Sequence, residues 1–228
     1  MFSARQGFFH QEVATPEYSG PFSDDSDTLL LLHLENNVTD DNSTARTAYD
    51  QSTQGSFAFS SSVVKFGSYS LGGGGIPGGW QDNVNPSTWA DFDTADFTIE
   101  FWARFDASAN TDQLQVGAAA TGDWQVFIGF DSGFTAFGRT NIAWDVSTTT
   151  SYSADTWYHF AFVRQGANLW IWRDGSQLAR TTNNAAKDFA MSYFRANFGG
   201  NAAASDYVYV DEFRISDIAR YTVPFIIN

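Results

Sequence analysis

The strongest constraint on the fold is a segment in which large apolar side chains recur at every second residue. Residues 96–105 read DFTIEFWARF, so that the odd-numbered side chains from Phe97 to Phe105 point to one face of an extended strand and the even-numbered ones to the other. No segment of the sequence sustains the 3.6-residue period of an amphipathic helix. The chain is therefore expected to be an all-β protein.

Further short apolar segments are separated by turn-forming residues. Asp174-Gly175 is the sharpest of these turns, because this dipeptide favours the tight turn of a β-hairpin. Strict alternation is expected in the last long strand, with Val208, Val210, Glu212 and Arg214 sharing one face. Many short strands with frequent turns predict two packed antiparallel sheets or a barrel. The expected strands are 28–34, 56–59, 68–71, 96–105, 124–130, 134–139, 157–165, 169–173, 177–181 and 207–215.

The first 27 residues differ in composition from the rest. They combine two prolines and an acidic cluster with several aromatic residues, and they show no strand or helix period. Two interpretations are open: a frayed terminus, or an extended arm that binds a neighbouring subunit through Phe2, Phe8 and Phe9. We favour the arm, because a solvated tail rarely carries so many aromatic residues. The predicted organisation is an arm over 1–27 and one domain over 28–228.

Charge and composition exclude several classes of partner and chemistry. The chain has 26 Asp and Glu against 12 Lys and Arg, a net charge of −14, whereas nucleic acid and anionic membranes select clustered basic residues. Neither partner is expected. The sequence has no Cys, which excludes disulfides, thiolate-bound zinc and a Cys nucleophile. No secretion signal is recognisable near the amino terminus, and no apolar run has membrane-spanning length.

The sequence lacks a recognisable catalytic constellation. It has no Gly-x-Ser-x-Gly elbow and no phosphate-binding Gly-rich loop with a Lys. A glycosidase needs two carboxylates about 5–9.5 Å apart, and no expected strand carries two acids at the matching i, i+2 spacing. His159 is interpreted as a histidine packed within the sheet. The protein is therefore expected to be non-enzymatic.

Tryptophans in polar surroundings are the best candidates for ligand contact. Trp80 and Trp89 lie in GGWQDNVNPSTWADF, beside Asp82 and Asn83, and Trp144 lies in NIAWDVS. A flat indole face next to carboxylate and amide groups is what sugar recognition uses. Packing within the domain and contact with other subunits are the alternatives for these tryptophans.

Several motifs occur in an order that is typical of one family. The chain resembles the laminin-G-like, concanavalin A-like jelly-roll domain, in the form found in bacteriophage virion proteins. The resemblance covers residues 28–225 and implies a sandwich of two antiparallel sheets. The motifs that carry it are TLLLLHLENNVTDDNS, KFGSYSLGGGG, DFTIEFWARF, DTWYHFAFVRQGANLWIWRDGSQLA and YVDEFRISDIARYT.

The resemblance also implies ligands and a biological setting. Members of the family bind glycans or a structural calcium ion, and Asp40 and Asp211 match positions that contribute to calcium binding in some members. No other cofactor is expected. The phage-like motifs imply a virion structural subunit on the virion surface, a capsid decoration or head or tail fibre protein, whose partners are other virion proteins and copies of itself. The alternative is an adhesin module that recognises host surface glycans.

Overall fold

The computed structural model of the chain describes residues 15, 17–42, 51–54, 57–74, 78–82, 92–106, 113–117, 125–130, 132–140, 143–182, 189, 195–198 and 207–228. Two large sheets and one short strand pair account for the strands in these residues. Apart from the parallel pair β1–β17, adjacent strands in these sheets run antiparallel, as the sequence predicts. Within the described part of the chain, no apolar helix of membrane-spanning length occurs.

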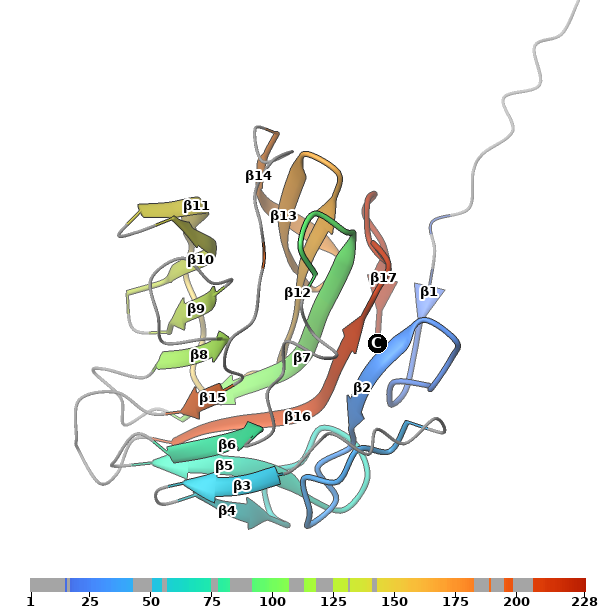
Figure 1. Ribbon diagram of the computed structural model, residues 1–228. Coiled ribbons are helices and arrows are strands. Elements are labelled where there is room, and N and C mark those ends of the chain that lie inside the picture. Colours follow the sequence, from blue (N-terminus) through green and yellow to red (C-terminus); the bar gives the residue numbers. More distant parts are fainter. Residues whose placement is uncertain are drawn as a thin grey trace, which may run out of the picture.

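In the described residues the first sheet has seven strands and forms one side of the sandwich (Figure 1). Its strands, in spatial order, are β11 (Ala143–Thr149), β10 (Phe134–Thr140), β9 (Gln125–Gly129), β8 (Gln113–Gly117), β15 (Arg195–Phe198), β6 (Gly78–Asp82) and β3 (Gln51–Gln54).

The second sheet has eight strands in the same described part of the chain and carries the long central strand that the sequence identifies. Its strands, in spatial order, are β14 (Ser176–Thr181), β13 (Asn168–Arg173), β12 (Tyr158–Gln165), β7 (Phe97–Phe105), β16 (Tyr207–Ser216), β5 (Ser70–Gly74) and β4 (Phe57–Ser60), and β2 (Thr28–Leu32) also pairs with β16.

The hydrophobic core fills the space between the two sheets. Phe101 of β7 stacks on Phe213 of β16, with ring centroids 5.7 Å apart and an angle of 9° between the ring planes. The seven-stranded sheet contributes mainly aliphatic side chains, among them Val126 and Ile128. Five side chains from the central strands β7, β12 and β16 are buried in this core: Ile99, Phe101, Phe160, Phe162 and Val210.

A β-bulge in β16 corrects the predicted alternation of that strand. Glu212 has φ of 51°, and the register between β16 and β7 shifts between Asp211 and Phe213. The extra residue places Phe213 in the core, on the same face as Val210. Arg214 therefore lies on the opposite face of the sheet, and the prediction that Val210, Glu212 and Arg214 share one face is wrong.

The outward face of the eight-stranded sheet is also covered, by residues from both ends of the described chain. Strand β1 (Glu17–Tyr18) pairs in parallel with β17 (Ile226–Ile227), beside β2 and β16 (Figure 1). Phe22 packs with Trp102 in a small apolar cluster on this face. Residues 17–27, part of the predicted arm, thus lie against the sheet of their own chain; the domain boundary stays a prediction, and Phe2, Phe8 and Phe9 lie outside the described residues.

Candidate functional site

An aromatic cluster lies on the outward face of the seven-stranded sheet. Phe127 stands between the core residues Val126 and Ile128 on β9, so its side chain points away from the core. Phe134 precedes Thr135 on β10, whose buried hydroxyl is hydrogen-bonded to Tyr152, so Phe134 points outward as well. The two phenyl centroids are 6.0 Å apart.

Trp144 completes this cluster from the neighbouring strand β11. Its ring centroid lies 6.0 Å from that of Phe127 and 6.3 Å from that of Phe134. Its register partner on β10 is Arg139. The preceding residue, Gly138, has φ of 68°, and a Cβ atom there would lie 2.5 Å from Oδ2 of Asp145. Glycine thus allows β10 and β11 to approach each other beside the indole. All three rings are partly exposed.

Polar side chains border the aromatic cluster on the same face. Gln115 of β8 is the register partner of Phe127 and is partly exposed. Ser147 and Thr149 of β11, the partners of Ala136 and Phe134, are both exposed. Directly paired residues share one face of a sheet, so these amide and hydroxyl groups flank the rings.

A cavity of about 470 Å³ adjoins the cluster at Thr149. Besides Thr149 it is lined by Ser132, Thr150 and Ser151, which all carry hydroxyl groups, and by the rings of Phe130 and Tyr152. Arg173 Nη1 donates a hydrogen bond of 2.9 Å to the carbonyl of Ser151 and so fixes the wall of the cavity. Aromatic surface and hydroxyl groups thus lie side by side.

The other predicted sugar-binding residues do not join this site. Trp80 and Asp82 lie on β6, not in a loop as the sequence predicts, and Trp80 pairs with Thr53 and Ala196. Four strands separate β6 from β11 in the sheet, so these two strands are roughly 24 Å apart at about 4.8 Å per strand. The prediction for Asn83 and Trp89 lies outside the described residues. Trp144 itself lies on an edge strand.

Asp40 and Asp211, the two predicted calcium ligands, each accept hydrogen bonds from backbone N–H groups. Asp40 Oδ1 accepts hydrogen bonds of 3.1 Å from the backbone N–H groups of Leu31 and Asn42, so it holds a loop. Asp211 Oδ2 accepts hydrogen bonds of 2.9 and 3.1 Å from the N–H groups of Lys65 and Phe66. Among the described residues, no three His, Asp or Glu side chains are grouped as a cation site requires.

We expect Asp211 to impose a pH dependence on stability. Burial raises the pKa of Asp211 from 3.8 to about 7, against the opposing effect of its two backbone hydrogen bonds. A carboxyl whose pKa is raised by folding stabilises the protein below the unfolded pKa, and this contribution is lost as the pH rises through the folded pKa. The free energy of unfolding should therefore fall by roughly 1–3 kcal/mol between pH 4 and 7.

Asp211→Asn tests this expectation, because the amide keeps an oxygen acceptor for Lys65 and Phe66 and does not ionise. Urea denaturation at several pH values should show a smaller fall in stability for the variant than for the wild type. Parallel curves over this pH range would contradict the assignment to Asp211.

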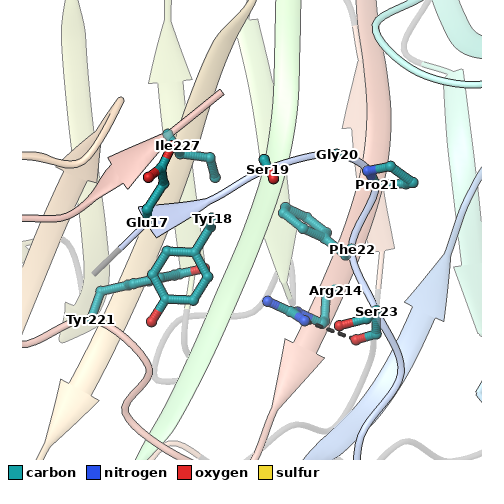
Figure 2. Close-up of a pocket in the computed structure, with 10 residues that line it drawn as sticks. All are labelled: Glu17, Tyr18, Ser19, Gly20, Pro21, Phe22, Ser23, Arg214, Tyr221 and Ile227. Carbon is teal, nitrogen blue, oxygen red and sulfur yellow. Dashed lines mark hydrogen bonds between the residues drawn. The ribbon is translucent and has the colours of Figure 1, made fainter. Parts of the chain in front are cut away.

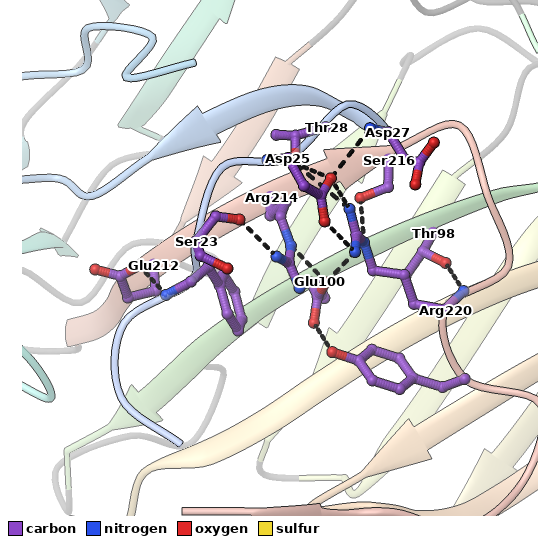
Figure 3. A network of polar contacts seen from close by, with 12 residues as sticks. Ser23, Asp25, Asp27, Thr28, Thr98, Glu100, Glu212, Arg214, Ser216 and Arg220 are labelled. Carbon is purple, nitrogen blue, oxygen red and sulfur yellow. Dashed lines mark hydrogen bonds and ion pairs between the residues drawn. The ribbon is translucent and has the colours of Figure 1, made fainter. Parts of the chain in front are cut away.

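Glu100 is the centre of a buried polar network on the outward face of the eight-stranded sheet (Figure 3). Its Oε1 accepts a 2.8 Å hydrogen bond from Arg214 Nε and lies 2.6 Å from Arg214 Nη2. Its Oε2 accepts a 2.7 Å hydrogen bond from the Tyr221 hydroxyl and lies 3.1 Å from His159 Nε2. Glu100 and His159 are fully buried, so this network stabilises the fold.

The same network fixes the segments that cover the sheet. Arg214 Nη1 donates a 2.9 Å hydrogen bond to the Ser23 carbonyl (Figure 3). Arg220 forms a bidentate ion pair with Asp25, in which Nη1 lies 2.9 Å from Oδ2 and Nη2 lies 2.7 Å from Oδ1 (Figure 3). Phe22 N–H donates a 2.8 Å hydrogen bond to Oε2 of Glu212. Residues 22–25 are thereby held against β16.

Comparison with protein families agrees with this architecture. A model described as the concanavalin A-like lectin/glucanases superfamily, Laminin_G_3, matches residues 77–222, which are more than half of the chain. This chain belongs to that superfamily. No curated protein matches its sequence. The match confirms the family that the sequence motifs indicate and the two-sheet jelly roll that they imply.

Solved structures with the same fold include binding domains of clostridial toxins. The binding domain of Paraclostridial Mosquitocidal Protein 1 superposes with a TM-score of 0.66 and 13% identity over 85% of this chain and 49% of that chain. The binding domain of botulinum neurotoxin DC, solved in complex with rat synaptotagmin II, superposes with a TM-score of 0.64 and 15% identity over 86% of this chain and 49% of that chain. A third structure comes from work on botulinum neurotoxin type C, whose cell entry is described as dependent on interaction with two ganglioside molecules. It superposes with a TM-score of 0.64 and 16% identity over 85% of this chain and 48% of that chain.

The chain spans about half the length of these structures. Because the sequence identities are low, the similarity shows a shared fold only. In this superfamily member, sequence reasoning finds Trp144 but misses its two phenylalanine neighbours. Their alternation with Val126, Ile128 and Thr135 is the sequence pattern that places them outward. The pairing of β9, β10 and β11, which brings them to Trp144, is not visible in the sequence.

Proposed function

We propose that this chain is a carbohydrate-binding module whose ligand lies on the outward face of the seven-stranded sheet. The observation that carries the proposal is the cluster of Phe127, Phe134 and Trp144. Three partly exposed aromatic rings on one sheet face form an apolar patch of the kind that marks binding surfaces.

The chemistry around the cluster matches the two-sided character of a sugar. The C–H faces of a pyranose ring bury apolar area against an aromatic ring, while its hydroxyl groups need hydrogen-bond partners around the edge. Gln115, Ser147 and Thr149 supply such partners beside the rings. The adjoining cavity of about 470 Å³ has the size of a small-molecule site and offers further hydroxyl groups.

The comparisons support this proposal through the superfamily and its neighbours. The superfamily description itself includes lectins. One structural neighbour is described by its interaction with two ganglioside molecules, which carry glycans. Binding domains among the neighbours also favour a non-enzymatic role for this chain.

The place of this module in a larger assembly rests on the sequence motifs. A virion subunit at the virion surface, bound to other virion proteins and to copies of itself, is the setting that those motifs favour. The fold and the comparisons support glycan binding rather than this setting. A glycan-binding module carried on a virion would satisfy both proposals.

The proposed site is tested by the double variant Phe134→Ala, Trp144→Ala. We expect the wild type to bind members of an immobilised glycan panel and the variant to bind the same glycans at least about tenfold more weakly, because the stacking surface is lost. Titration of the best glycan by calorimetry measures the change. Val223→Ala is the control, because Val223 is exposed and lies in the segment that covers the other sheet.

Two results would overturn the proposal. The first is a wild-type protein that binds no glycan of the panel. The second is binding that is unchanged in a double variant whose circular dichroism spectrum is that of the wild type.

A further inference from the structure

A second cavity lies on the opposite side of the molecule, beneath residues 17–23. Its volume is about 300 Å³, at the lower end of the range for small-molecule sites. In Figure 2 the chain from Glu17 to Ser23 passes over the cavity, and Arg214 and Tyr221 lie on the side of the sheet. The proposed glycan face, by contrast, belongs to the seven-stranded sheet.

The roof of this cavity is fixed at both ends. At one end, β1 pairs with β17, and Asn228 N–H donates a 3.0 Å hydrogen bond to the Tyr18 carbonyl. At the other end, the Ser23 carbonyl accepts a hydrogen bond from Arg214. Gly20, between these anchors, has φ of 81°, and a Cβ atom there would meet no atom within 4 Å. Glycine at this position supplies the left-handed backbone conformation that the roof adopts between its two anchors.

The cavity wall combines hydrogen-bond donors, acceptors and an aromatic ring. A guanidinium has five N–H donors, and the bonds from Arg214 to Glu100 and Ser23 engage three of them. The Glu17 carboxylate, which accepts a 3.0 Å hydrogen bond from Asn228 Nδ2, supplies acceptors at the wall. Tyr18 is 38% exposed and contributes a flat apolar surface.

The charges around the cavity favour a neutral ligand. Arg214 is in direct contact with Glu100, so its positive charge is compensated within the wall. The Glu17 carboxylate adds a negative charge, which disfavours an anion. Donors and acceptors without a net positive field suit hydroxyl groups better than a carboxylate or phosphate.

Two unsatisfied polar atoms lie in the layer below the cavity. His159 Nδ1 and Trp102 Nε1 are buried and, within the described residues, have no hydrogen-bond partner. The ring of His159 contacts Phe22 and Tyr221, which line the cavity, at centroid distances of 5.7 and 6.0 Å. Buried polar atoms are normally paired with protein groups or ordered water, so this layer has hydrogen-bonding capacity beside the cavity.

We propose that this cavity is a second ligand site, which takes a compact neutral ligand rich in hydroxyl groups, of the size of one sugar ring. The site is separate from the proposed glycan face and goes beyond the proposed function. A chain with both sites binds ligands on opposite faces of the sandwich.

The test follows the backbone amides of Ser19 and Ser23 and the Arg214 Nε–H by NMR during titration with methyl glucoside, methyl galactoside and methyl mannoside. We expect at least one of these probes to shift the three signals in a saturable manner. Ser19→Trp should weaken this binding at least about tenfold, because Ser19 lines the cavity and a bulky indole there takes up its space. The matched control is Ser61→Trp, at an exposed serine between β4 and β5.

Trp144→Ala separates this site from the proposed glycan face, since the three signals should respond in that variant as they do in the wild type. The proposal is overturned if no sugar probe shifts them, or if sodium acetate shifts them and the sugars do not. It is also overturned if folded Ser19→Trp protein responds like the wild type.

Discussion

Replacing Phe101 with alanine is expected to lower the free energy of unfolding by about 3–5 kcal/mol. The side chain is fully buried and stacks on Phe213 of the neighbouring strand, so its removal leaves a cavity in the middle of the core. Phe160 and Phe162 border the same space, with ring centroids 6.0 Å from that of Phe101. Because three large rings lose a packing partner together, the neighbouring residues cannot refill the space cheaply.

Urea denaturation of purified protein measures this effect. Phe134→Ala is the matched control, because it removes the same atoms from a partly exposed ring outside the core. We expect the control to cost roughly 1 kcal/mol. A Phe101→Ala variant that is no less stable than the control would mean that the inner face of β7 is assigned wrongly.

Replacing Glu100 with glutamine should destabilise the protein by a similar amount. The substitution keeps the shape of the side chain but leaves the Arg214 guanidinium, of which 5% is exposed, without its counter-charge. Breaking a buried ion pair from one side typically costs about 3–5 kcal/mol. Asp155→Asn is the control, because Asp155 is exposed and its ion pair with Arg104 contributes about 1 kcal/mol or less.

The acid dependence of stability provides a second measurement on Glu100. Burial opposes ionisation of this carboxyl, yet the charge of Arg214 and the hydrogen bonds from His159 and Tyr221 lower its pKa from 4.5 to about 2. A pKa that folding lowers gives stability above the unfolded pKa, and this stability is lost as the pH falls through the folded value. The difference between wild type and Glu100→Gln should therefore shrink from pH 4.5 to 2. A constant difference would contradict the assignment.

The central strands of the eight-stranded sheet could be predicted from sequence because their packing imposes a local pattern. Phe97 to Phe105 alternate between two buried faces, and the Asp174-Gly175 turn has positive φ at both residues, 49° and 73°, as the tight hairpin turn requires. By contrast, β6 and β11 contain glycine or polar residues at positions where the alternating pattern of a strand would have apolar ones. These two segments are strands because they pair with neighbouring strands. Propensity alone does not identify such strands.

The candidate site could be predicted only in part, since it depends on contacts between strands. Trp144 is conspicuous as an indole beside an acid, but nothing in the sequence pairs it with Phe127 and Phe134. Trp80 also has an acid nearby in the sequence, yet four strands of the sheet separate it from Trp144. The bulge at Glu212 was also not predictable, because the positive φ of a non-glycine residue is stabilised by tertiary contacts with Phe22 and His33.

Strand β2 acquires its partner late during synthesis on the ribosome. Leu30, Leu31 and Leu32 are almost completely buried, yet the strand that pairs with them, β16, ends at residue 216. The hydrogen bond from Phe22 to Glu212 spans 190 residues. Pairings of this range form slowly, so a nascent chain exposes an apolar strand edge until most of the sequence has been translated. Efficient production in a cell should therefore depend on chaperones that shield this leucine-rich segment during translation.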